Sequence, residues 1–78
     1  LKRVYGTEHV EYALVETNLG AALLHQPHIA KDHLTHALQI YEKEYGSNSA
    51  KVGDVLSNLG NAYKNLEEFD RALGVFNR

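Results

Sequence analysis

The five histidines are the side chains of this sequence best suited to catalysis or metal binding. Four of them lie close together in the chain, at His25, His28, His33 and His36. His33 and His36 are one helical turn apart, and two imidazoles at that spacing can share a zinc or nickel ion. The sequence has no cysteine, and no carboxylate stands where it would complete the ligand set. A metal site is therefore the less favoured of two interpretations.

The favoured interpretation places both histidines on an ordinary helix surface. His33 and His36 fall between apolar residues at helical spacing, which are Ala30, Leu34 and Ala37. Because apolar side chains take the buried face of an amphipathic helix, we expect the two histidines to face solvent. The sequence thus predicts neither a metal nor any other cofactor.

No other group of residues indicates an enzyme. Glu67 and Glu68 form a pair of acids, but they stand at a predicted turn, where charged side chains are solvated. The sequence contains no G-x-S-x-G, no P-loop and no H-E-x-x-H motif. We therefore predict that the chain has no catalytic residues.

Length and composition restrict the class of protein further. The 78 residues allow at most one small domain, and 44% hydrophobic with 23% charged residues is a globular composition. The formal net charge of −2 gives no electrostatic reason to bind nucleic acid. No apolar run approaches the roughly 18 residues of a membrane span, and the lack of cysteine fits a reducing compartment. We predict a cytoplasmic protein that binds neither nucleic acid nor membrane.

The elements that must position these residues are indicated by the stretch from Asn58 to Tyr63, which reads NLGNAY. Apolar residues keep helical spacing here, at Leu56, Leu59, Ala62, Tyr63 and Leu66. Gly60 interrupts them, although glycine inside a helix costs about 1 kcal/mol relative to alanine. We therefore expect another helix backbone to approach closely at Gly60, and also at Gly20, the matching position of an earlier copy.

A shift of forty positions reveals that earlier copy. It places Tyr5-Gly6 on Tyr45-Gly46, Val15 on Val55, Asn18-Leu19-Gly20 on Asn58-Leu59-Gly60, and Ala22 on Ala62. Internal periods of about 20–50 residues are typical of repeat arrays. The pattern Leu59-Gly60-x2-Tyr63, followed by Ala72 and Phe76, resembles the tetratricopeptide repeat. The long period is most similar to that of the kinesin-light-chain type.

The resemblance covers essentially the whole chain, residues 1–78, and implies an all-α fold. That fold is an α-solenoid of about two antiparallel helix-turn-helix repeats. The predicted parts are residues 1–5 as the end of a preceding helix, 6–45 as the first repeat and 46–78 as the second, truncated repeat. Because the segment ending in Tyr5-Gly6 aligns with the tail of a repeat, we expect the chain to be a fragment of a longer array.

Glycine and proline mark the expected helix boundaries. The predicted helices span residues 8–25, 28–45, 49–65 and 67 to the end, with breaks at 6–7, 25–27, 46–48 and 65–67. Gly6 is read as a C-terminal cap and Thr7 as an N-cap. Pro27 cannot continue a helix but suits the first position of the next one. Because the interval from the first-repeat glycine to its matching alanine is two residues short, we expect a tighter or slightly mis-angled helix pair in that repeat.

The resemblance also implies a concave groove, lined by the first helix of each repeat, that binds a peptide. The groove positions in this sequence are Thr17, Asn18, Ala21 and Leu24, then Asp54, Ser57, Asn58, Asn61, Lys64 and Asn65. Asn18 and Asn58 are equivalent, and an amide can both donate to and accept from a peptide backbone. The alternative is that each asparagine only caps a helix or meets water. A carboxylate clamp is not expected, since Thr17 and Ser57 stand where it needs basic residues.

These observations favour a protein–protein interaction module, a scaffold or adaptor whose groove binds an extended peptide or a partner surface. Two alternatives remain open. Repeat arrays need polar outer faces at their ends, and the final helix instead offers Leu73, Val75 and Phe76, so the chain could assemble into a homo-oligomer through uncapped ends. The chain could also be the regulatory segment of a larger enzyme.

Overall fold

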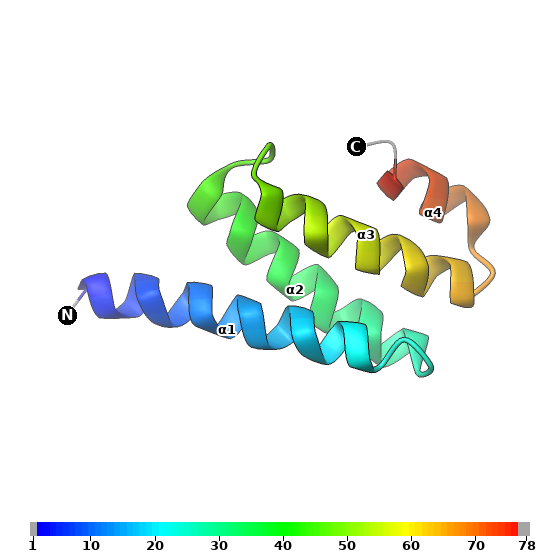
Figure 1. Ribbon diagram of the computed structural model, residues 1–78, viewed down its shortest axis with the longest axis horizontal. Coiled ribbons are helices and arrows are strands. Elements are labelled where there is room, and N and C mark those ends of the chain that lie inside the picture. The colour runs from blue at the N-terminus through cyan, green and yellow to red at the C-terminus, as the bar shows by residue number, and fades with distance from the viewer. Residues whose placement is uncertain (1, 77–78) are drawn as a thin grey trace.

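The computed structural model describes residues 2–76, with side chains from residue 10 onward, and it consists of four helices. They are α1 (Lys2–Ala22), α2 (Pro27–Tyr45), α3 (Ala50–Asn65) and α4 (Phe69–Phe76). Each helix packs antiparallel on the one before it (Figure 1). Among the described residues, the only contact between helices that are not consecutive joins α1 to α3. The described residues contain no strand. The predicted all-α fold of helix-turn-helix pairs is confirmed.

The helices form two layers. In Figure 1, α1 and α3 lie side by side in front of α2, and α4 lies beside α3 at the opposite end of the stack from α1. The buried core is made mostly by α2 and α3, and its largest fully buried side chains are Tyr41, Leu34, Val52 and Val55. Since α1 and α3 share this support, the side chains between them are held at fixed positions. No helix in the described part of the chain is long and apolar enough to span a membrane.

Local chemistry explains three of the boundaries. Pro27 is the first residue of α2, where its missing N–H has no helical partner to lose. Gly46 ends α2 with a φ of 85°, a conformation that glycine adopts without a Cβ clash. Ser49 caps α3 by accepting a hydrogen bond from the Val52 amide at 3.2 Å. The predicted break at 46–48 is thereby confirmed and extends one residue further.

The predicted break at residues 6–7 is wrong, because α1 passes through Gly6 and Thr7 as continuous helix. Gly46 is followed by Ser47, Asn48 and Ser49, which favour turns, whereas Thr7 is followed by residues that a helix tolerates. Gly6 therefore sits inside the helix rather than at its end. Position 1, assigned to a preceding helix, and positions 77–78, assigned to the last helix, lie outside the described residues.

The other two breaks are shifted by one or two residues. Residues 23–26 lie outside helix, two residues earlier than expected, and α3 includes Asn65 so that the last break falls at 66–68. In the forty-residue register, α1 ends three residues before α3 does. The missing residues of the first repeat are thus removed largely from the C-terminal end of α1.

Gly20 and Gly60, which the forty-residue shift aligns, lie at close contacts, but the nearest atoms belong to side chains rather than to a backbone. A Cβ added at Gly20 would lie 2.6 Å from Leu34 Cδ2, and one added at Gly60 would lie 2.9 Å from Phe76 Cδ1. The expectation of a close approach is confirmed, while its assignment to a neighbouring backbone is wrong. Each glycine makes room for one large apolar residue of the following helix.

Candidate functional site

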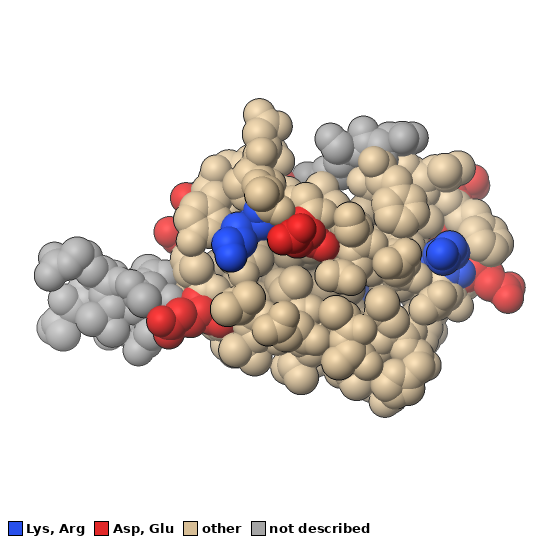
Figure 2. All heavy atoms as spheres, in the orientation of Figure 1, with Lys and Arg blue, Asp and Glu red and all other residues tan. Residues whose placement is uncertain are grey.

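An open groove of about 350 Å³ lies between α1 and α3, with α2 behind it. Its walls and floor come from three helices and are lined by Leu14, Thr17, Asn18, Tyr41, Lys51, Asp54, Ser57 and Asn58. Five of these were predicted from the sequence, namely Thr17, Asn18, Asp54, Ser57 and Asn58. Uncharged side chains cover most of the face on which the groove opens (Figure 2). The groove is therefore suited to an uncharged polar backbone more than to a strongly charged ligand.

The side-chain amide of Asn58 uses its nitrogen in a hydrogen bond within the protein. Its Nδ2 donates to the backbone oxygen of Asp54 at 3.3 Å, one turn earlier in α3. This bond holds the side chain in one orientation and leaves the amide oxygen able to accept a further hydrogen bond. Asn18 and Ser57 are exposed on the same groove. Three uncharged polar side chains thus surround a space that a peptide backbone could enter.

The floor of the groove is the phenol of Tyr41, whose residue is 2% exposed. Burial raises the pKa of Tyr41 above its usual value of 10.0, hydrogen bonding with Thr17 lowers it, and the charges of Tyr45 and Asp54 raise it further. Thr17 is itself buried and donates its hydroxyl to the Ala13 carbonyl at 2.7 Å. Tyr41 and Thr17 therefore act as fixed parts of the floor.

The remaining five predicted groove residues lie elsewhere. Ala21 and Lys64 are exposed, Asn61 is half-buried, and Leu24 is partly buried against the hydrophobic core, but none of them lines the groove. Asn65 donates from Nδ2 to the backbone oxygen of Leu24 at 3.0 Å. This bond joins the end of α3 to the turn between α1 and α2. The Asn65 amide nitrogen and the Leu24 carbonyl are thus already used within the fold.

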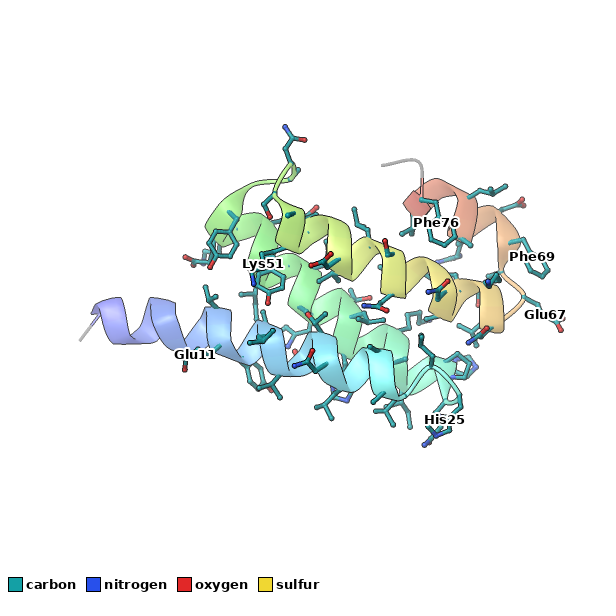
Figure 3. The ribbon with its side chains drawn as sticks, in the orientation of Figure 1. Glu11, His25, Lys51, Glu67, Phe69 and Phe76 are labelled. Carbon is teal, nitrogen blue, oxygen red and sulfur yellow. The ribbon has the colours of Figure 1, made fainter. Side chains whose placement is uncertain are left out.

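Three lining residues were not predicted. Leu14 precedes Asn18 by four positions, and Lys51 precedes Asp54 by three, so helical spacing could have found both. Figure 3 shows Lys51 near the beginning of α3, on the side facing α1. Tyr41 is different, because it belongs to α2 and reaches the groove only through the packing of the two layers.

The expectation that both histidines face solvent is correct for His36, whose side chain is 48% exposed, and only partly correct for His33, at 31%. Both also contact a carboxylate that the sequence did not reveal. Glu16 on α1 is 5% exposed, and its Oε1 lies 2.9 Å from His33 Nδ1. His36 Nδ1 contacts Oε2 of the same carboxylate, and the ring of Tyr12 meets His36 edge to face. A buried carboxylate needs such partners, because an unpaired one would be costly to desolvate. The histidines thus help to join α1 to α2.

This cluster does not form a metal site within the described residues. Both Nδ1 atoms are directed at the Glu16 carboxylate, whose two oxygens are each occupied by one histidine. His25 and His28 are exposed and lie at the turn and the first residues of α2. The spacing of His33 and His36 is therefore explained by their shared contact with the Glu16 carboxylate.

Comparison with protein families assigns most of the chain. A family profile described as tetratricopeptide repeat matches residues 12–78. Comparison with curated proteins and comparison with solved structures each gave no significant match.

Proposed function

The chain belongs to the tetratricopeptide repeat family, whose members are generally protein–protein interaction modules, and we propose that it binds an extended peptide in the groove between α1 and α3. The observation that carries this proposal is the lining of the groove. Side chains from three helices meet there, and its polar members include Asn18, Ser57 and Asn58. A scaffold or adaptor role follows, because the chain would hold a segment of another protein without changing it covalently.

Asn58 is the side chain best placed to recognise a peptide backbone. Its bond to the Asp54 backbone oxygen fixes the amide before any ligand arrives, so little side-chain entropy is lost on binding. The free amide oxygen would accept a peptide N–H, which otherwise loses its water without replacement. Asn18, across the groove on α1, would supply a second such contact.

The apolar part of the groove would select a side chain of the peptide. Leu14 is 47% exposed at the wall, and Tyr41 forms the floor behind it. Burying apolar surface against them is favourable by about 25 cal/mol per Å². The two charged residues of the lining, Lys51 and Asp54, have opposite signs, so the groove has no strong net preference for an acidic or a basic ligand.

We also propose that the chain is of the long-period, kinesin-light-chain-like type. The forty-residue register supports this subtype, because Gly20 and Gly60 each accept a large side chain of the next helix. Asn18 and Asn58 are related by the same shift and both line the groove. Their equivalence suggests that one peptide would run along both repeats.

The test is a peptide-array screen with the chain, followed by titration of the best peptide against variants. Asn58→Ala should weaken binding several-fold, since losing one such hydrogen bond costs about 0.5–1.5 kcal/mol. Asn18→Ala should add to that loss. Asn61→Ala is the matched control, because Asn61 lies on the same helix but outside the groove.

Changes on the far side of α1–α2 provide a second control. His33→Ala and His36→Ala alter the contact with Glu16 and leave the groove lining unchanged. They should not affect peptide affinity in molecules that remain folded by circular dichroism. Unchanged affinity in Asn58→Ala, or a loss confined to the histidine variants, would remove the binding site from the groove.

A further inference from the structure

The charged side chains that line the groove all belong to one of its walls. Lys51 and Asp54 are three positions apart on α3 and therefore lie on the same side of that helix. Figure 3 shows Lys51 near the beginning of α3, on the side facing α1. The opposite wall, on α1, contributes Leu14, Thr17 and Asn18, which carry no charge. The two charges are thus not balanced from across the groove.

Lys51 and Asp54 are both able to pair with a ligand. Each is exposed, and among the described residues neither side chain forms an ion pair. The first turn of α3 contains Lys51 and no acidic residue, so the lysine and the helix dipole both favour an anion there. Burial and, to a smaller extent, the charge of Asp54 raise the pKa of Tyr41, which places the Asp54 carboxylate near the groove floor. The wall therefore favours an anion at the beginning of α3 and a cation about one turn further along.

The spacing of these two charges matches an extended peptide that runs along α3. Three residues of an α-helix advance about 4.5 Å along its axis. In an extended chain, side chains on one side recur at every second residue, about 6.7 Å apart. The flexible four-carbon stem of Lys51 can span the difference of about 2 Å. Two peptide side chains separated by one residue can thus reach both charges of the wall at once.

We propose that the groove selects an extended peptide with one acidic and one basic side chain two residues apart, the acid paired with Lys51 and the base with Asp54. This inference rests on peptide binding in the groove and adds the charge pattern of the peptide. Because the two wall charges have opposite signs, the groove selects the order and spacing of the ligand charges rather than their sum. Arginine suits the basic position, since its guanidinium can donate two parallel hydrogen bonds to the Asp54 carboxylate.

A set of matched peptides tests this pattern. The peptide selected on the array is resynthesised with Glu-x-Arg, Arg-x-Glu, Glu-x-Glu, Arg-x-Arg or Gln-x-Gln, and the pair of positions is moved along its length. One of the two mixed pairs should bind the chain about two- to fivefold more tightly than Gln-x-Gln, and the like-charged pairs should show no such gain. The gain should shrink at high ionic strength, because exposed charge pairs are screened by salt.

Charge reversals in the groove should change which peptide binds best. Lys51→Glu gives the wall two acids and should make Arg-x-Arg the preferred peptide, whereas Asp54→Lys should make it Glu-x-Glu. The double variant carries the same two charges in the opposite order and should prefer the mixed peptide that the parent chain disfavours. Lys64→Glu is the matched control, because it changes the net charge as Lys51→Glu does but at an exposed residue outside the groove. It should leave the preference unchanged.

The possible results separate this inference from peptide binding itself. If the array peptide binds and Asn58→Ala weakens it, while Lys51→Glu and Asp54→Lys leave the preferred pair unchanged, the charge pattern is overturned and the peptide groove stands. An equal change of preference in Lys64→Glu would also overturn the pattern, since net charge alone would then explain it. If no peptide on the array binds the parent chain, peptide binding and its charge pattern both fail.

Discussion

Replacing Gly20, Gly53 and Gly60 in turn with alanine measures how tightly the helices are packed at these three positions. At Gly20 the new Cβ would lie 2.6 Å from Leu34 Cδ2, and Leu34 is 0% exposed. At Gly60 the nearest atoms belong to the ring of Phe76, which is 50% exposed and can turn toward solvent. At Gly53 a Cβ would meet nothing within 4 Å. The same substitution therefore tests a contact with a buried side chain at Gly20, a contact with a movable side chain at Gly60, and open space at Gly53.

The expected free energies follow from two opposing terms. Alanine is more favourable than glycine in a helix interior by about 1 kcal/mol, and overpacking of a well-packed core costs about 1–3 kcal/mol. Gly53→Ala gains the first term alone and should raise the free energy of unfolding. Gly60→Ala should lie near zero, because the Phe76 ring can move. Gly20→Ala should destabilise the fold, and its free energy of unfolding should be about 1–3 kcal/mol lower than that of Gly53→Ala.

Urea unfolding followed by circular dichroism measures these differences, since a shift in midpoint at constant slope reports stability. Gly53→Ala is the internal control for helix propensity. If Gly20→Ala proves as stable as Gly53→Ala, Leu34 can move away freely and the close-contact explanation of Gly20 is wrong. The larger substitution Gly60→Leu should destabilise by about 1–3 kcal/mol, because a longer side chain exceeds what rotation of Phe76 can accommodate.

Three further changes test other parts of the fold. Asn65→Ala should lower the free energy of unfolding by about 0.5–1.5 kcal/mol by removing the bond to the Leu24 carbonyl, and equal stability would show that water replaces it. Glu67 has a φ of 64°, so Glu67→Gly should stabilise by about 1 kcal/mol while Glu67→Ala should not, as urea midpoints would show. Burial raises the pKa of Tyr41 in the folded state above 10.0. The contribution of neutral Tyr41 to the free energy of unfolding should therefore be fully present below about pH 10 and should be lost as the pH rises through the higher pKa of the folded state. Tyr41→Phe should reduce this loss in alkaline urea titrations, and an unchanged pH dependence would assign it to other groups.

Sequence reasoning succeeded where a residue type restricts the backbone directly. Pro27 and Gly46 mark a helix beginning and a helix end because each has a conformational property that acts locally. The helix end predicted at Gly6 was wrong, because glycine permits a helix to end without requiring it to end. The difference between Gly6 and Gly46 lies in the residues that follow them, and only the later glycine is followed by a run of turn formers.

Contacts between helices were predicted less completely, because they depend on packing across the chain. Asn18 and Asn58 were expected on the groove because the resemblance to the tetratricopeptide repeat implies one there, and the repeat register makes the two residues equivalent. The partnership of Glu16 with His33 could not, since it joins residues 17 positions apart on two helices. The role of Tyr41 as the groove floor has the same origin. Spacing identifies the face of one helix, whereas the fold determines what that face meets.

The most direct test of peptide binding in the groove is a residue-by-residue NMR titration with the peptide selected on the array. The amide signals of Asn18, Ser57 and Asn58 should shift together with those of Leu14 and Lys51, with one common affinity. Signals of Tyr12, Val15 and Leu19, which are exposed on α1 outside the groove, and of the outer surface of α2 should remain in place. Shifts confined to Tyr12, Val15 and Leu19, or to the surface around His33 and His36, with the groove signals unchanged, would contradict the account.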